Sequence, residues 1–281
     1  MRVAFGTAVY EQNPVFTAEY IDTLNNQDNS DFDVLLLNDN LPDESCHQIK
    51  HILQRNVFLL KAKEGSKPSA LRTELLKTAF DNGYELLILG DFDDVFSENR
   101  VSEIIKGFDR GYGFFYNDLY YLSDRKKYFQ TIPYETLEIS QILEYNYLGL
   151  TNTAINLKVL TTDIINELYA CCLITFDWFL FLTLLIHDIK GKKINNAKTY
   201  YRLHPLNIVG KRTNTAEEIK REIQVKLDLY NALKHKNPIF IEKIAYYIEL
   251  KRQIDLSGIM NFTNYNDYWW GKSNSNMERE S

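Results

Sequence analysis

The sequence predicts an α/β fold with a mostly parallel sheet that helices cover on both faces. Between residues 2 and 111, short apolar segments alternate four times with segments of helical periodicity. The apolar segments are almost continuous, which is typical of strands that are buried on both faces. The chain has 281 residues, of which 45% are hydrophobic and 25% charged. This size and composition suit one large globular domain with an appendage.

The first half of the chain has clear start and stop signals for its helices. Pro14 stands at the beginning of the first predicted helix, Gly83 follows the end of the third, and Ser97 is placed to cap the fourth. The predicted strands cover residues 2–10, 32–39, 56–62 and 84–91, and the predicted helices cover residues 14–27, 42–54, 68–83 and 97–111.

The pattern after Gly111 is less regular. The predicted strands here cover residues 111–123, 152–160 and 193–204, and the predicted helices cover residues 136–146, 160–169, 177–191, 214–236 and 238–254. The last two helices are amphipathic. We therefore expect a main domain over residues 1–210 and a helical extension with a polar tail over residues 211–281.

Charge and cysteine content narrow the functional class. The chain has 32 basic and 38 acidic residues, a net charge of −6, which argues against a nucleic-acid-binding protein. Three cysteines form no disulfide framework, so a reducing compartment is expected. The N-terminal segment becomes polar too early for a signal peptide, and the longest apolar run, residues 179–186, is too short to span a bilayer. These features predict a cytoplasmic protein and leave contact with the inner face of a membrane open.

Polar residues follow several predicted strands at the end where open α/β sheets bind ligands. Asp39 follows the second strand, and Asp91, Asp93 and Asp94 follow the fourth. Residues two apart in an extended segment point the same way, so Asp91 and Asp93 can hold a hard divalent cation such as Mg²⁺. Glycine-rich phosphate loops are missing from the sequence, which leaves a metal as the means of binding phosphate. The alternative is a solvated turn that caps the next helix.

Several motifs occur in a fixed order along the chain. They are "TAVYEQN" (7–13), Asp39, Arg72 in "SALRTELL" (69–76), "DFDD" (91–94), Asp177 in "TFDWFLF" (175–181) and "YRLHPLNIVG" (201–210). In this order and spacing they resemble the GT-A glycosyltransferases, particularly the large inverting group called family 2. The chain departs from the family pattern at Asn38, Thr73 and Phe176, where aspartate, asparagine and glutamate are usual.

The resemblance implies a GT-A fold, with a Rossmann-like mixed sheet flanked by helices, and makes residues 1–210 the catalytic domain. It implies a hexosyltransferase-type enzyme that moves a sugar from a nucleotide-diphosphate sugar to a hydroxyl group with inversion. Asp91, Asp93 and His204 would hold Mn²⁺ or Mg²⁺, and Asp177 would be the general base. The resemblance assigns the following residues to donor binding: Thr7, Ala8, Tyr10, Asp39, Arg72, Asp91, Phe92 and Asp93.

The resemblance also implies the reaction partners. The donor is expected to be a UDP-sugar, with dTDP- and GDP-sugars as alternatives. The acceptor is expected to be a glycan or a lipid-linked saccharide, as in surface polysaccharide biosynthesis. The sequence does not specify an oligomeric state.

Other interpretations of the same residues stay open at this point. The chain could be a nucleotidyltransferase acting on a sugar phosphate, although its first loop has no glycine-rich basic motif, or a degenerate GT-A module that binds glycans. Asp177 could only cap its helix, His204 could be a core residue, and Arg72 could lie on the surface. The aromatic group Tyr268–Trp270 could pack on the domain, contact the acceptor or touch lipid headgroups.

Overall fold

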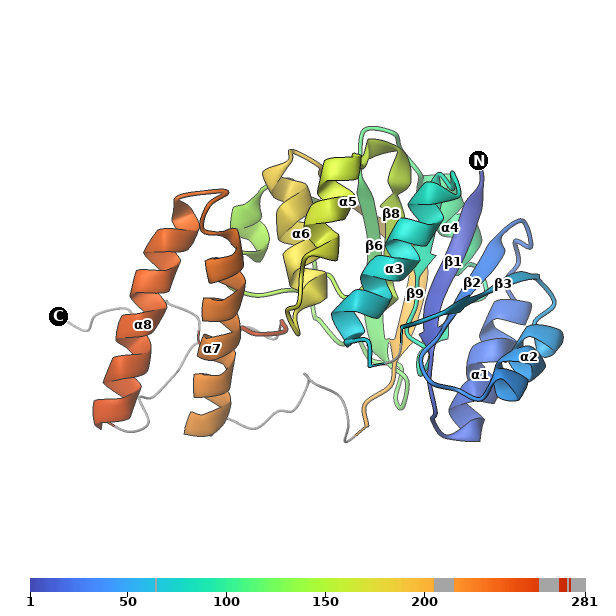
Figure 1. The fold of residues 1–281 in the computed structure, drawn as a ribbon, viewed down its shortest axis with the longest axis horizontal. Helices are drawn as coiled ribbons and strands as arrows, with labels where there is room; N and C mark the ends of the chain where they lie inside the picture. Colours follow the sequence, from blue (N-terminus) through green and yellow to red (C-terminus); the bar gives the residue numbers. More distant parts are fainter. Residues whose placement is uncertain (64, 205–214, 258–267, 272, 274–281) are drawn as a thin grey trace.

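The computed structural model describes residues 1–63, 65–204, 215–257, 268–271 and 273, which form a mixed sheet flanked by helices and a helical hairpin at one end (Figure 1). The strands are β1 Val3–Val9, β2 Asp33–Asn38, β3 Asn56–Lys61, β4 Leu86–Leu89, β5 Val95–Phe96, β6 Phe114–Tyr121, β7 Glu135–Thr136, β8 Thr153–Asn156 and β9 Gly191–Tyr201. The α-helices are α1 Pro14–Asn25, α2 Asp43–Ile52, α3 Pro68–Asp81, α4 Arg100–Gly107, α5 Thr162–Tyr169, α6 Phe176–Ile186, α7 Ala216–Leu233 and α8 Ile239–Ser257.

The sheet has nine strands in the order β3-β2-β1-β4-β8-β6-β9-β5, with β7 paired to β9. Strands β3, β2, β1 and β4 run parallel to one another, as the alternating first half predicts. The other half is mixed because β8 runs antiparallel to both β4 and β6, and β5 and β7 run antiparallel to β9. The expected mixed sheet flanked by helices is therefore present, while a mostly parallel sheet describes only the first half.

Alternate residues of the central strands enter two different hydrophobic cores. In β4, Leu87 and Leu89 belong to one buried cluster, and Leu86 and Ile88 belong to the other. Because neighbouring side chains of a strand point to opposite faces, the two clusters lie on opposite sides of the sheet. Helices α3, α5 and α6 cover the first side, and α1, α2 and α4 cover the second.

Two predicted elements need correction. Residues 136–146, predicted as a helix, form part of β7, a short 3₁₀ helix at Ile139–Ile142 and an irregular segment. Tertiary contacts replace the helical bonds here, since the Trp178 indole N–H donates to the carbonyl oxygen of Ile142 (2.6 Å). The predicted strand 152–160 is limited to β8, and a 3₁₀ helix follows it at Leu157–Val159.

The helical extension packs on the rest of the protein. Helices α7 and α8 form an antiparallel pair beyond α6 (Figure 1). Several of their buried residues, including Ile223, Leu227 and Tyr247, belong to the same hydrophobic cluster as Trp178 of α6. None of the helices in the described part of the chain is long and apolar enough to cross a membrane.

Candidate active site

The chain makes a tight turn directly after β4. The N–H of Asp94 donates to the carbonyl oxygen of Asp91 (3.2 Å), so this segment is not extended as expected. Gly90 enters the turn where a side chain would not fit, because a Cβ atom there would lie 2.6 Å from the ring of Phe96 and 2.7 Å from that of Phe5. The turn nevertheless brings Asp91 and Asp93 to the same pocket.

The three aspartates of this turn have different surroundings. Asp94 is buried and accepts hydrogen bonds from the Thr151 hydroxyl (2.6 Å) and from the backbone N–H of Arg202 (2.8 Å). Asp91 faces the Arg72 guanidinium (Nη2–Oδ1 3.6 Å), and Asp93 Oδ2 lies 2.8 Å from His204 Nε2. Asp94 therefore has a structural position, while Asp91 and Asp93 line the pocket.

Burial and repulsion from neighbouring carboxylates make the ionised forms of Asp91 and Asp94 unfavourable. Burial, followed by the charges of Asp93 and Asp91, raises the pKa of Asp94 well above its usual value. Burial also raises the pKa of Asp91, and the neighbouring Arg72 opposes this shift. Such a concentration of negative charge is stabilised in its ionised form by a bound cation.

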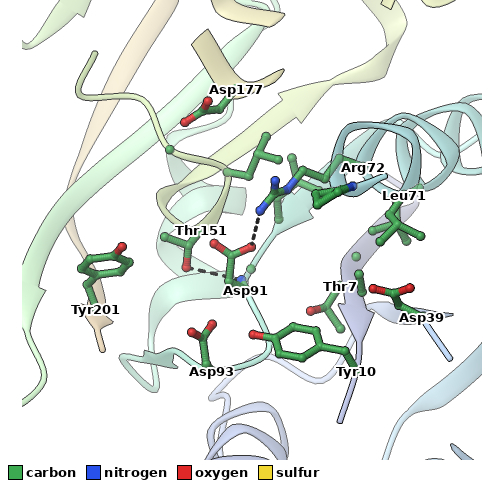
Figure 2. Close-up of a pocket in the computed structure, with 18 of the residues that line it drawn as sticks. Thr7, Tyr10, Asp39, Leu71, Arg72, Asp91, Asp93, Thr151, Asp177 and Tyr201 are labelled. Carbon is green, nitrogen blue, oxygen red and sulfur yellow. Dashed lines mark hydrogen bonds and ion pairs between the residues drawn. The ribbon is translucent and has the colours of Figure 1, made fainter. Parts of the chain in front are cut away.

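One pocket of about 380 Å³ lies at the carboxyl ends of β1, β2 and β4. Figure 2 shows Asp91 near the middle, with Asp39 and Thr7 on one side and Asp177 and Tyr201 on the other. The volume falls in the range of pockets that bind small molecules. Its lining residues are Gly6, Thr7, Ala8, Tyr10, Asp39, Pro68, Leu71, Arg72, Leu75, Leu89, Gly90, Asp91, Asp93, Gly149, Leu150, Thr151, Ile174, Thr175, Asp177, Tyr201, His204, Trp269 and Trp270.

The end of β2 explains why asparagine replaces aspartate at position 38. The Asn38 side chain accepts from the N–H of Leu41 (2.8 Å) and donates to the carbonyl oxygen of the same residue (2.9 Å). It thereby closes the turn after β2, and Asn40 adopts a left-handed conformation within this turn (φ 64°). Asp39 is left to face the pocket, and its partial burial raises its pKa.

Helix α3 presents two neighbouring residues to different surroundings. Arg72 reaches the pocket. Thr73 is buried on another side of the helix, where its hydroxyl group donates to the carbonyl oxygen of Ser69 (2.8 Å) and packs toward Leu168 of α5. The change from the usual asparagine at position 73 therefore lies in the core and not in the pocket.

Asp177 lies in the first turn of α6 and points into the pocket. Its Oδ2 accepts a hydrogen bond from the Asn146 side-chain amide (3.3 Å). Burial raises the pKa of Asp177 to about 6, and the nearby Arg72 opposes this shift. A carboxylate with such a pKa is mostly ionised at neutral pH, and it is a stronger base than an ordinary aspartate.

Comparison with known protein families agrees with this geometry. The family model described as glycosyl transferase family 2 matches residues 7–179, which is more than half of the chain. The chain belongs to glycosyl transferase family 2. The protein is therefore a glycosyltransferase, and the predicted family and enzyme class are confirmed.

Solved structures support the fold of this family 2 enzyme. S. aureus TarS (residues 1–349) is 16% identical, with a TM-score of 0.59 over 92% of this chain and 77% of that chain. The mannosyltransferase PcManGT from Pyrobaculum calidifontis is 13% identical, with a TM-score of 0.53 over 92% of this chain and 76% of that chain. A search of curated proteins found no significant match.

The pocket of this family 2 enzyme gathers most of the residues that the sequence singled out. The exception is Phe92, whose ring is buried and packs edge-on against Tyr10 and Tyr20 (ring centroids 6.0 and 5.0 Å apart). Pro205 and the rest of the "YRLHPLNIVG" motif after His204 lie outside the described residues. The residues brought together are Thr7, Ala8, Tyr10, Asp39, Arg72, Asp91, Asp93, Asp177 and His204.

The donor atoms near the turn suit a hard or borderline divalent cation. Two carboxylates, Asp91 and Asp93, and the imidazole of His204 line one part of the pocket. Among the described residues, no group of three or more histidine, cysteine or acidic side chains is arranged so that it could hold a metal ion by itself. Mg²⁺ typically takes only one or two protein carboxylates and completes its coordination with phosphates and water. The residues present therefore fit Mg²⁺ or Mn²⁺ bound together with a diphosphate.

The sequence did not predict a role for Arg100, a buried residue that supports the turn after β4 in this family 2 enzyme. Its side chain is 0% exposed, and its Nη2 donates to the carbonyl oxygens of Leu89 (2.8 Å) and Thr151 (2.9 Å). Its guanidinium also lies 4.5 Å from the ring centre of Phe96. Arg100 thus ties the end of β4 to the residue that holds Asp94, and no local sequence signal distinguishes it from an exposed arginine.

We expect Arg100→Met to destabilise the protein by about 2–4 kcal/mol. Methionine fills a similar volume, but it leaves buried carbonyl oxygens without a donor, at about 1–3 kcal/mol each, and removal of the buried charge offsets part of this. The free energy of unfolding should be measured in guanidinium chloride. Arg110→Met, at an exposed position, is the control, and equal stability of the two variants would contradict a structural role for Arg100.

Proposed function

We propose that this glycosyltransferase moves a sugar from a nucleotide-diphosphate sugar to a saccharide hydroxyl, with inversion at the anomeric carbon and with a divalent metal. The observation that carries the proposal is the pocket that holds the carboxylate pair Asp91 and Asp93 together with the separate carboxylate Asp177. A metal–diphosphate site and a general base beside one pocket are the groups that a single displacement needs.

The proposed donor is a UDP-sugar. The similar S. aureus TarS structures contain UDP-GlcNAc or UDP, and the similar mannosyltransferase contains GDP-Man and Mn²⁺. In this chain the nucleotide would lie beside Thr7, Ala8, Tyr10, Asp39 and Arg72, all of which line the pocket. A GDP-sugar and a dTDP-sugar are the alternatives to be tested.

In the proposed reaction Asp177 accepts the proton of the acceptor hydroxyl as the oxygen attacks the anomeric carbon. The hydrogen bond from Asn146 orients the carboxylate, and the raised pKa strengthens it as a base. Arg72 offers a positive charge between Asp91 and Asp177, where it can contact the diphosphate. Asp91, Asp93 and His204 would hold Mg²⁺ or Mn²⁺, which supplies charge stabilisation for the departing nucleoside diphosphate.

We further propose that residues 1–210 carry the catalytic groups and that residues 211–281 are the helical extension. The family resemblance supports a glycan or lipid-linked saccharide as acceptor, in surface polysaccharide biosynthesis at the cytoplasmic face of a membrane. Tests of donor binding come first, because they do not require the acceptor.

We expect UDP to raise Tm only when Mn²⁺ or Mg²⁺ is present. At a nucleotide concentration 100 times Kd, binding adds about 2.7 kcal/mol to stability, or roughly 5 °C in Tm for a protein of this size. Thermal unfolding should be followed with UDP, GDP and dTDP, each with Mn²⁺ and with EDTA. The proposal would be overturned if none of the three nucleotides stabilised the protein in a metal-dependent way.

A further inference from the structure

The C-terminal aromatic segment reaches the pocket from far along the chain. Trp269 and Trp270 both line it, as do Asp177, Thr175 and Ile174. Two main-chain hydrogen bonds hold the segment: the N–H of Trp269 donates to Asn146 (3.0 Å), and the N–H of Asn146 donates to Trp269 (2.9 Å). The segment is therefore an integral part of the pocket wall.

Trp269 anchors this wall. It is 6% exposed, its indole N–H donates to the Tyr128 hydroxyl (3.1 Å), and its ring packs on Phe129 (centroids 5.1 Å apart). Its ring also lies against Gly149, where an added Cβ atom would be only 2.7 Å from the indole. A glycine at position 149 permits this close approach.

A second anchor follows at Ser273. The backbone N–H and the hydroxyl of this buried residue both donate to Glu222 Oε1 (2.7 and 2.6 Å), and Lys226 Nζ donates to Ser273 Oγ (3.0 Å). Lys226 is fully buried, and it also faces Glu144 Oε2 at 3.8 Å. Helix α7 thereby fixes the segment at Ser273, as Asn146 does at Trp269.

Trp270 lies between the two anchors, and its properties differ from those of Trp269. It is partly exposed, and its backbone has a positive φ of 62°, which is rare for a bulky residue and costs on the order of 1 kcal/mol or more. Within the described part of the chain, no hydrogen-bond partner is found for its indole N–H. The two anchors thus hold a strained, partly exposed residue that lines the pocket.

We propose that Trp270 is the platform on which a pyranose ring of the acceptor stacks. The inference rests on the proposed glycosyl transfer and specifies its acceptor side. The C–H groups on one face of a pyranose are apolar and weakly positive, and they complement the negative face of an indole. The indole N–H can donate to a ring hydroxyl. Because Trp270 shares the pocket with Asp177, a stacked ring presents a hydroxyl group on the side of the proposed base.

The test uses simple glycosides, so it does not require the natural acceptor. Saturation-transfer NMR should be recorded for methyl β-D-glucopyranoside, its galacto and manno analogues, and octyl β-D-glucopyranoside, with UDP and Mn²⁺ present. We expect at least one pyranoside to receive saturation at its ring protons. Trp270→Ala should weaken this binding about tenfold, as expected for loss of aromatic stacking, and Trp270→Phe should restore part of it.

Tyr134→Ala is the matched control, because Tyr134 is 54% exposed and does not line the pocket. It should bind the pyranoside as the wild type does. Equal binding by the wild type and Trp270→Ala would overturn the platform, and so would saturation confined to the octyl chain. If UDP binds but no pyranoside does, the platform fails while the proposed donor chemistry stands. If no nucleotide binds, the proposed function itself fails.

Discussion

Asp177→Asn is expected to lower the rate of sugar transfer by about 10²–10⁴-fold, which is the usual contribution of a general base. Asparagine has the same shape and can still accept the hydrogen bond from Asn146, but it cannot accept a proton. Nucleotide binding should persist, because Asp177 is separate from Asp91 and Asp93 in the pocket (Figure 2). Initial rates of transfer and calorimetric titration with UDP and Mn²⁺ measure the two effects separately.

The pH dependence gives this prediction a second readout. Because the folded-state pKa of Asp177 is about 6, kcat/KM should fall as the pH drops below 6, where the base becomes protonated. The ordinary pKa of an aspartate is 3.8, so the carboxyl ionises more easily in the unfolded chain than in the folded protein. Ionisation of Asp177 therefore lowers the free energy of unfolding, increasingly so as the pH rises from about 4 to 6. Asp177→Asn should therefore be more stable than the wild type at pH 7, by roughly 1–3 kcal/mol.

The control for this variant is Asp163→Asn, at an exposed position in the first turn of α5. It should change neither transfer nor the pH profile. Transfer at the wild-type rate by Asp177→Asn would exclude Asp177 as the base and leave it as a helix cap. Loss of UDP binding in the same variant would instead place Asp177 in the donor site.

Asp93→Asn is expected to abolish the metal-dependent stabilisation by UDP and to lower transfer by about 10²-fold or more, since metal binding contributes several kcal/mol of charge stabilisation. The same variant should be more stable than the wild type without metal. Asp93 raises the pKa of both Asp91 and Asp94 through repulsion. Removal of its charge therefore makes the ionised forms of both neighbours less unfavourable in the folded protein. Opposite changes in stability and activity are typical of residues kept for function.

Thermal unfolding of Asp93→Asn should be measured without ligand, with EDTA, and with UDP and Mn²⁺. The three midpoints separate a loss of metal-dependent UDP binding from a change in the stability of the protein alone. Asp22→Asn, at an exposed position of α1, controls for the loss of one negative charge. Should Asp93→Asn retain a Mn²⁺-dependent response to UDP, Asp93 would not be a metal ligand. A lower stability in EDTA would indicate that Asp93 is structural in the way that Asp94 is.

The carboxyl edge of the sheet was the most predictable part of the site. Local apolar runs predict β1 to β4, and parallel strands bring their polar ends together, so Asp39 and Asp91 could be expected at one pocket. The tight turn that positions Asp93 was not predictable from spacing alone, because it depends on contacts with Thr151 and the backbone of Arg202. A local pattern does not report contacts between segments so distant in the chain.

The same limit explains what was missed elsewhere. The antiparallel insertion of β8 between β4 and β6 follows from pairing across a long connection. Residues 136–146 have a helical pattern, but their partners on α6 and β9 decide their conformation. The role of Arg100 and the position of the Tyr268–Trp270 group, which the sequence left open, depend on segments that are remote in sequence, whereas the motif positions of Asp177 and His204 are visible in the chain itself.

The contacts of Asn146 affect the order in which parts of the site form during synthesis of the chain. Its main chain pairs with Trp269, and its side chain donates to Asp177. Domains fold while the ribosome is still adding residues, so the sheet and its carboxylates can assemble before Trp269 has left the ribosome. Asn146, whose side chain donates to Asp177, can pair with Trp269 only after Trp269 has left the ribosome. We therefore expect a nascent chain to acquire nucleotide binding earlier than transferase activity, which stalled chains of increasing length would reveal.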